Sequence, residues 1–300
     1  MEDTEADSIT EDTTICEIAE RWAPSGWEHI FREALADFET IDEILEEEIR
    51  KCGRILPLKK DIFRAFELTT LKDVKVVIIG QDPYHQLINI DGKNVPRAQG
   101  LSFSVDRRDV IPSSLKNIFV ELQNTVRNFT MPRHGDLTRW TQQGVLLLNA
   151  CLTVNPNAAA SHGNIWLGFI KRVIKAITRE NKSCIFLLWG KEAQKIELLL
   201  ENKGICLTAA HPSGLSANRG FFGCNHFNLV NIKLKEQGLT PIDWNLDPPR
   251  IVKKQYIEPK AKTTDSHHII VPDAVNRDRA SGGESGGVDN SSVIPTIEKL

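Results

Sequence analysis

The sequence lacks the cysteine pairs that hold metal ions. Its six cysteines are isolated from one another, and no C-x-x-C occurs. Three of the six lie in or beside apolar runs, which is typical of small buried hydrophobic residues in a reducing compartment. We therefore expect no metal ion, no cofactor and an intracellular location.

Long apolar runs are absent as well. No stretch approaches the length that a membrane-spanning helix needs. The N-terminal residues are acidic, without the apolar core of a signal peptide or the arginines of a transit peptide. We expect no membrane partner and no export.

Glycine-rich phosphate loops are missing too. Neither G-x-G-x-x-G nor G-x-x-x-x-G-K follows the first strongly apolar stretch, residues 74–79. This disfavours a nucleotide- or flavin-binding protein with a doubly wound sheet. No strong basic targeting cluster is present either.

The charge is small but uneven. The net charge is -3, while residues 1–24 carry eight acids and one base. Residues 25–250 are therefore net positive, at +4. A mildly basic body suits a polyanion such as DNA, although ordinary surface charge explains this value equally well.

Composition divides the chain into three parts. With 41% hydrophobic and 26% charged residues, it is typical of a soluble globular protein. We expect residues 1–24 to be an acidic disordered segment and residues 251–300, rich in Ser, Gly, Asp and Pro, to be a flexible tail. The globular domain is expected over residues 25–250.

Four apolar stretches predict the strands of one sheet. They are residues 74–79, 144–150, 184–190 and 205–210, and helical patterns separate them. Strands that are apolar on both faces and alternate with helices form parallel sheets through right-handed crossovers. The predicted fold is a single α/β domain with a central, mainly parallel four-stranded sheet flanked by helices on both faces.

Other patterns predict the remaining elements. Apolar residues at helical spacing over residues 27–49, 61–68, 112–126, 166–177, 193–200 and 224–237 predict helices. Serine is the expected cap of the helix that follows Pro112. GLSFSV, residues 100–105, alternates like a strand. Asp91-Gly92 predicts a small hairpin or compact loop within residues 86–97.

Three predicted strands end in polar side chains suited to chemistry or recognition. They are Asp82, Asn149 and His211. Each has a plain alternative as a turn residue or a satisfied histidine. Because ligands of open α/β sheets bind at the carboxyl ends of the strands, we expect the three to share one site.

Five motifs in order carry a family resemblance. They are GQDPYH at 80–85, GLSFSV at 100–105, LLLNACLTV at 146–154, FLLWG at 186–190 and HPSGLSANRGFFGCNHF at 211–227. Over residues 25–246 the chain resembles the family 1 uracil-DNA glycosylases. The resemblance implies a monomeric hydrolase that flips uracil out of single- or double-stranded DNA and cleaves its N-glycosidic bond. The abasic site that remains starts base-excision repair.

The resemblance also implies the catalytic and uracil-binding residues. Asp82 would orient a water and support the cationic sugar, while a neutral His211 would donate to uracil O2. The implied uracil-binding residues are Gln81, Tyr84, Phe103 and Asn149. Among these, Asn149 would read the base edge, Phe103 would stack on the ring, and Tyr84 would exclude the methyl group of thymine.

A third set of residues is implied to bind DNA. Ser114, Ser213 and Ser216 would hold phosphates beside the lesion, and Leu215 would enter the duplex as an apolar wedge. Arg219 lies in the same loop, whose hydroxyls and amides suit phosphate contacts.

The chain departs from the family pattern in four places. Gly214 replaces a proline, residues 111–113 replace a proline-rich stretch, Gln99 replaces a histidine, and residues 86–97 are longer than usual. The residues with implied chemical roles are intact. These departures therefore concern DNA affinity more than activity.

An alternative is an accessory DNA-binding protein of replication with weak or no catalysis. The intact Asp82, Asn149 and His211 argue against it. From the substrate alone we expect a nuclear location, and the two tails are candidates for binding replication or repair proteins.

Overall fold

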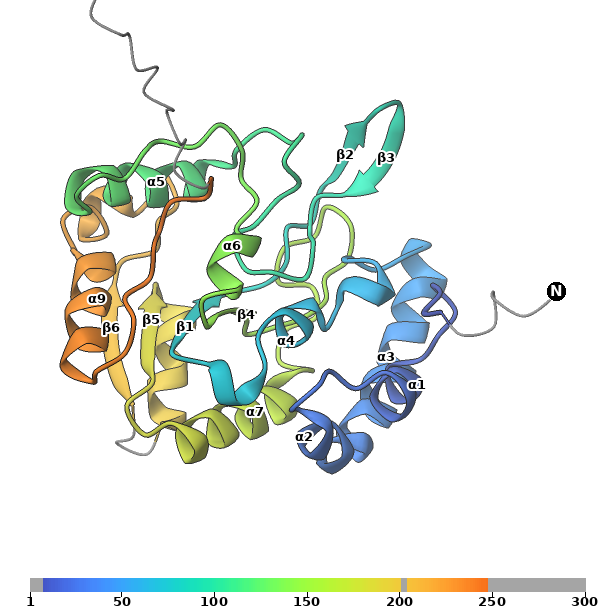
Figure 1. Ribbon diagram of the computed structural model, residues 1–300. Coiled ribbons are helices and arrows are strands. Elements are labelled where there is room, and N and C mark those ends of the chain that lie inside the picture. Colours follow the sequence, from blue (N-terminus) through green and yellow to red (C-terminus); the bar gives the residue numbers. More distant parts are fainter. Residues whose placement is uncertain (1–7, 201–203, 248–300) are drawn as a thin grey trace, which may run out of the picture. The chain divides into compact units, whose positions relative to one another are not determined.

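A computed structural model describes residues 8–200 and 204–247 (Figure 1). The chain divides into two units, residues 1–250 and 251–300. The tail expected at residues 251–300 lies outside the described residues. No helix in the described part of the chain is long and apolar enough to cross a membrane.

Four parallel strands form the central sheet. They are β1 (Val76–Gly80), β4 (Val145–Asn149), β5 (Ile185–Trp189) and β6 (Ile205–Ala209), in the order β4-β1-β5-β6. All three pairings are parallel. The predicted α/β fold is confirmed, and the carboxyl ends of all four strands lie at one edge of the sheet.

Helices cover both faces of this sheet. The helices of the described residues are α1 (Ile15–Arg21), α2 (Glu28–Glu33), α3 (Leu35–Cys52), α4 (Arg64–Leu68), α5 (Ser113–Thr125), α6 (Thr138–Thr141), α7 (Leu167–Glu180), α8 (Lys191–Gln194) and α9 (His226–Glu236). The predicted helical stretch at residues 193–200 is in fact the end of α8 followed by a short 3-10 helix, Lys195–Leu199.

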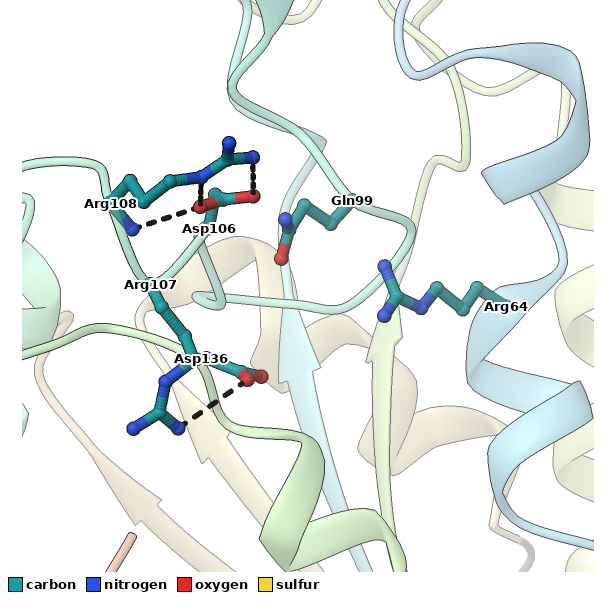
Figure 2. Close-up of a pocket in the computed structure, with 6 residues that line it drawn as sticks. All are labelled: Arg64, Gln99, Asp106, Arg107, Arg108 and Asp136. Carbon is teal, nitrogen blue, oxygen red and sulfur yellow. Dashed lines mark hydrogen bonds and ion pairs between the residues drawn. The ribbon is translucent and has the colours of Figure 1, made fainter. Parts of the chain in front are cut away.

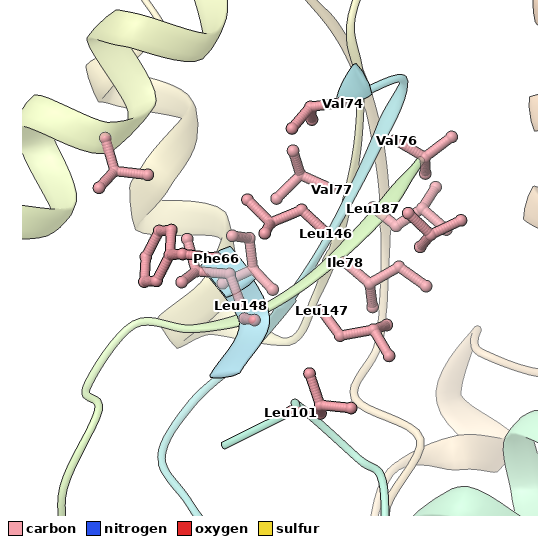
Figure 3. Close-up of a cluster of buried hydrophobic side chains, with 14 of the residues drawn as sticks. Phe66, Val74, Val76, Val77, Ile78, Leu101, Leu146, Leu147, Leu148 and Leu187 are labelled. Atoms are coloured by element: carbon pink, nitrogen blue, oxygen red, sulfur yellow. The ribbon is translucent and has the colours of Figure 1, made fainter. Parts of the chain in front are cut away.

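Side chains alternate across the two buried faces. In Figure 3, Val77 and Leu148 point towards Phe66, whereas Ile78 and Leu187 point to the opposite face. The register explains this, because Ile78 pairs with Leu187 and therefore shares its face. All five residues of β1 are buried, which is why the strand reads as an uninterrupted apolar run.

A different aromatic cluster packs on each face. One cluster is built around Phe66 of α4 and contains Phe63 just before α4, Phe31 of α2, Phe38 of α3, and Trp166 and Phe169 at the start of α7. The other surrounds Trp189 at the end of β5 and consists of Phe221, Phe227, Trp244 and Trp140. The second cluster reaches the carboxyl edge of the sheet, because Phe103 also contacts Trp189 there.

The N-terminal segment is more ordered than the sequence suggested. Disorder was expected through residue 24, but residues 15–21 form α1, with Ile15 and Ile18 buried. A capping box of Thr14 and Glu17 closes the amino end of this helix. The Asp42 carboxylate also accepts hydrogen bonds from the N–H groups of Ile15 and Cys16. The acidic composition concealed this short buried helix.

Two local predictions near residue 100 are wrong. GLSFSV is a turn, because Phe103 has a positive φ of 63° and cannot continue a strand. Its apparent alternation arises because Leu101, Ser102, Ser104 and Val105 are buried in the turn. In α5, Pro112 occupies the N-cap position and no side chain caps the helix, so the expected serine cap does not form.

The segment 86–97 forms the predicted hairpin. Strands β2 (Leu87–Ile90) and β3 (Lys93–Pro96) pair antiparallel across Asp91-Gly92, both of which have positive φ. In Figure 1 the hairpin projects from the carboxyl edge of the sheet. Arg97 pairs with Asp109 and Arg108 pairs with Asp91, so two ion pairs fix the hairpin to the turn at residues 106–109.

Candidate active site

The three polar strand ends come together as predicted. Asn149 lies directly opposite Gly80 in the β1–β4 register, and Asp82 follows Gly80 by two residues. His211 follows β6, and its pKa is sensitive to the charge of Asp82. The Asp82 carboxylate and the His211 ring are therefore close enough at the carboxyl edge of the sheet to influence each other's charge.

Gly80 makes room for the Asn149 amide. A Cβ at position 80 would collide with Asn149 Oδ1 and would lie 2.9 Å from the Cβ of Ser102. Asn149 is only 7% exposed, so its side chain cannot swing into solvent. The requirement for glycine at the start of GQDPYH is thus a packing requirement for the amide beside it.

One oxygen of the Asp82 carboxylate is fixed. The Ala160 N–H donates to Asp82 Oδ2 at 2.6 Å. Pro83 stiffens the chain directly after the carboxylate. The backbone before it is held as well, since the Cys151 N–H donates to the Gln81 carbonyl at 3.0 Å.

His211 has a defined tautomer. The Ser213 N–H donates to His211 Nδ1 at 3.0 Å, so Nδ1 is an acceptor and the proton of the neutral ring lies on Nε2. Burial lowers the pKa of His211, and the negative charge of Asp82 opposes this effect. The imidazole is therefore neutral at pH 7 and offers an Nε2–H donor.

Phe103 and Tyr84 form an aromatic wall. The Phe103 ring lies 6.0 Å from the His211 ring and 5.7 Å from the Trp189 ring, measured between centroids. The Tyr84 hydroxyl donates to the Phe103 carbonyl at 3.2 Å. Burial raises the pKa of Tyr84, so its hydroxyl stays protonated. The wall gives a flat ligand a surface to stack on.

Gln81 and Asp82 also line a cavity of about 140 Å³. Its other walls come from Ala150, Cys151, the segment around Ala160, the first turns of α7, and α8 with the following 3-10 helix. Glu192 and Lys195 form an ion pair at its rim. Asp82 thus faces open space between the end of β1 and α7.

The loop after His211 is internally braced. Ser213 and Ser216 share a hydrogen bond of 2.9 Å between their hydroxyl oxygens, and Ser216 Oγ also donates to the His211 carbonyl. Asn117 of α5 donates to the Pro212 carbonyl at 2.7 Å. This contact ties the helix that carries Ser114 to the loop.

Leu215 is the most exposed large apolar residue in the described part of the chain, at 88%. Arg219 is also exposed, in a 3-10 turn three residues after Ser216. Because Gly214 has no side chain and nothing lies within 4 Å of where its Cβ would be, Leu215 stands on an open loop.

A larger cleft of about 390 Å³ has a different set of lining residues (Figure 2). It is lined by Arg64, Gln99, Asp106, Arg107, Arg108 and Asp136. Arg108 is paired with Asp106 and Arg107 with Asp136, so acids offset much of its positive charge. Gln99, one of the departures from the family pattern, lines this cleft and not the aromatic wall.

Three contributors to the site were not predicted. Ala160 holds Asp82, and Gly190, at the end of β5, lets His211 approach, since a Cβ there would lie 2.9 Å from the His211 Cβ. Ser102 anchors the Phe103 turn by donating its N–H to the Leu147 carbonyl. Within the described ranges, no group of three or more His, Cys, Asp or Glu side chains is arranged to hold a metal ion.

Comparison with known proteins gives one consistent family. The model of the uracil DNA glycosylase superfamily matches residues 66–235. The chain is 50% identical to a uracil-DNA glycosylase of Mannheimia succiniciproducens over 201 residues, which is 66% of this chain and 86% of that protein. It is also 50% identical to the Escherichia coli uracil-DNA glycosylase over 192 residues, 63% of this chain and 80% of that protein.

Solved structures give the same result. The crystal structure of mimivirus uracil-DNA glycosylase has a TM-score of 0.68 and 30% identity, and the match covers 74% of this chain and 86% of that one. A mimivirus variant crystallised in complex with UGI has a TM-score of 0.69 at 30% identity, covering 74% and 89% of the two chains.

The Gly80 packing gives a test of the site. Gly80→Ala should displace the Asn149 amide and weaken the binding of free uracil at least about tenfold, because a buried polar partner of the base is lost. The sheet should persist, with the destabilisation of about 1–3 kcal/mol that overpacking usually causes. Calorimetric titration with uracil and thermal melting measure the two effects. Unchanged uracil affinity would show that Asn149 does not contact the base.

Proposed function

The chain belongs to the uracil-DNA glycosylase superfamily, and we propose that it hydrolyses the N-glycosidic bond of uracil in DNA. The abasic site left behind is the substrate for base-excision repair. The observation that carries the proposal is the meeting of a carboxylate, Asp82, and a neutral imidazole, His211, at one sheet edge beside the Asn149 amide. Relatives at 50% identity carry the name uracil-DNA glycosylase.

In the proposed reaction, Asp82 and His211 stabilise opposite charges. As the bond between C1′ and N1 breaks, the sugar becomes cationic and uracil takes both bonding electrons. The Asp82 carboxylate supports the cation and orients the water whose oxygen bonds to C1′, and the proton of that water is released. His211 Nε2–H donates to uracil O2, where the negative charge develops. Uracil leaves as a comparatively stable anion, so no second carboxylic acid is required.

Recognition of the base is assigned to the surrounding wall. Asn149 offers an acceptor for N3–H and a donor for O4, which is the pattern that uracil complements. Phe103 stacks on the ring. Tyr84 fills the space that the methyl group of thymine would need, and Gln81 contributes backbone contacts.

Binding of DNA is assigned to the braced loop and the start of α5. Ser114, Ser213 and Ser216 hold phosphates on either side of the flipped nucleotide, with Arg219 nearby. The exposed Leu215 fills the gap that the nucleotide leaves in the stack.

We also propose that the protein acts in the nucleus, because its substrate is DNA, and as a monomer, because one chain supplies Asp82, Asn149 and His211. Replication or repair partners are proposed to bind the tails, which lie largely outside the described residues. An accessory role in replication without catalysis has no observation in its favour, since Asp82, Asn149 and His211 are all present.

Uracil release from a single-stranded oligonucleotide tests the function directly. The purified protein should excise uracil, and Asp82→Asn and His211→Ala should each lower turnover by about a hundredfold or more, since each removes preorganised stabilisation of charge. Affinity for uracil-containing DNA should change much less. A parent protein without activity would favour the accessory role, and equal losses in binding and turnover would remove the catalytic assignment.

Leu215 distinguishes duplex from single-stranded substrates. Leu215→Ala should slow excision from duplex DNA more than from single strands, because only a duplex must be unstacked to release the base. Turnover on the same sequence in both forms measures the difference. Equal impairment on the two substrates would contradict the wedge.

A further inference from the structure

The orientation of Asp82 depends on a loop that is remote in sequence. Ala160 is 78 residues away, and its N–H donates to Asp82 Oδ2 at 2.6 Å. The other oxygen, Oδ1, makes no hydrogen bond with the described residues. One backbone donor therefore decides which way the free oxygen of the carboxylate points.

This donor sits on an unfavourable backbone conformation. Ala160 has φ +57°, and Asn157 in the same loop has φ +60°. Alanine rarely adopts the left-handed region, so the surrounding structure must impose this conformation. Ala160 and its neighbours Ala159 and Ser161 are exposed, so packing of their own side chains does not do so.

The buried side chain of His162 holds this backbone conformation in place through its hydrogen bonds. Thr153 Oγ1 and His162 Nδ1 lie 2.7 Å apart, and His162 Nε2 lies 2.9 Å from Asn155 Oδ1. The known hydrogen-bond donors around His162 decide which of its ring nitrogens carries the proton. Trp166 Nε1 donates to Thr153 Oγ1 and the Asn155 amide donates to Glu48, so Thr153 donates to Nδ1 and Nε2–H donates to Asn155.

Both ends of the loop are attached to this network. Asn155 is its first residue, and the Asn155 N–H also donates to Ser161 Oγ at 2.7 Å. His162 follows Ser161 at the other end. The middle is tied to the catalytic turn, since the Asn157 N–H donates to the His85 carbonyl at 2.7 Å. Burial lowers the pKa of His162, which keeps the ring in the neutral form that this pattern requires.

We propose that His162 is a positioning residue for catalysis: through the loop 155–162 it holds the Ala160 N–H against Asp82 Oδ2 and so aims Oδ1 at the water and the sugar. This inference rests on the proposed role of Asp82 as the catalytic carboxylate. In this proposal His162 and Ala160 act through Asp82 and not on uracil or the reacting bond. Their contribution is geometric, and a small misplacement of a catalytic group is enough to cost about a hundredfold in rate.

A double-mutant cycle tests the proposal in the full-length protein. His162→Ala and Ala160→Pro, the second of which removes the N–H donor and also the positive φ that places it, should each lower single-turnover kcat on uracil-containing single strands by about tenfold to a hundredfold, with KM within about twofold. In an Asp82→Asn background, each should change kcat by less than about twofold, because the group that they position is already disabled.

His134→Ala is the matched control. His134 is another buried histidine with two hydrogen-bond partners, Asp136 and Asp247, but it belongs to neither the loop nor the network. It should lower the melting temperature about as much as His162→Ala, leave kcat unchanged in the parent and show no coupling to Asp82.

The outcomes separate the two proposals. If Asp82→Asn keeps full activity, the proposed role of Asp82 fails. If Asp82→Asn is impaired but the losses of His162→Ala and Ala160→Pro multiply with it, the carboxylate is catalytic and the positioning role is overturned. A loss that His134→Ala reproduces would show a general effect of destabilisation and would also overturn it.

Discussion

Parallel pairing of the four strands is the constraint on which the site depends. Because β1 pairs in parallel with both β4 and β5, and β5 with β6, all four strands end at the same edge of the sheet. The side chains that follow these strands are thereby brought to one place, where the loop 155–162 then orients the Asp82 carboxylate. Asp82, Asn149 and His211 come from three strands, and Gly190, at the end of the fourth, makes space for His211.

Tight packing at this edge of the sheet gives the converging side chains defined orientations and protonation states. Gly80 admits the Asn149 amide, and the Ser213 N–H selects the tautomer of His211. Burial keeps His211 neutral, while Asp82 keeps one oxygen free after accepting from Ala160. Backbone N–H groups fix His211 and Asp82, and close packing against Gly80 confines Asn149, so little reorganisation is needed when charge develops on a bound base.

The sheet and the meeting of its polar strand ends could be predicted from the sequence, because both follow from apolar runs several residues long. An apolar run such as residues 76–79 has one physical explanation, burial on both faces, and the polar residue after it must lie at an edge. The conformations of turns could not be predicted from the sequence in the same way. GLSFSV alternates like a strand, but Phe103 has a positive φ that only its tertiary contacts impose. Ala160 could not be found from composition, since alanine carries no signal for a left-handed donor. The burial of α1 against Asp42 was likewise concealed by the acids around it.

The protonation state of His211 is the most direct test of this account. The nitrogen chemical shifts of His211 can be measured in protein labelled at histidine, between about pH 5 and pH 8, where an ordinary imidazole titrates. The account predicts a neutral ring at neutral pH, with the proton on Nε2 and with Nδ1 unprotonated. It also predicts that the ring takes up a second proton only below the ordinary histidine pKa. An imidazolium at pH 7, or a neutral ring with its proton on Nδ1, would contradict it.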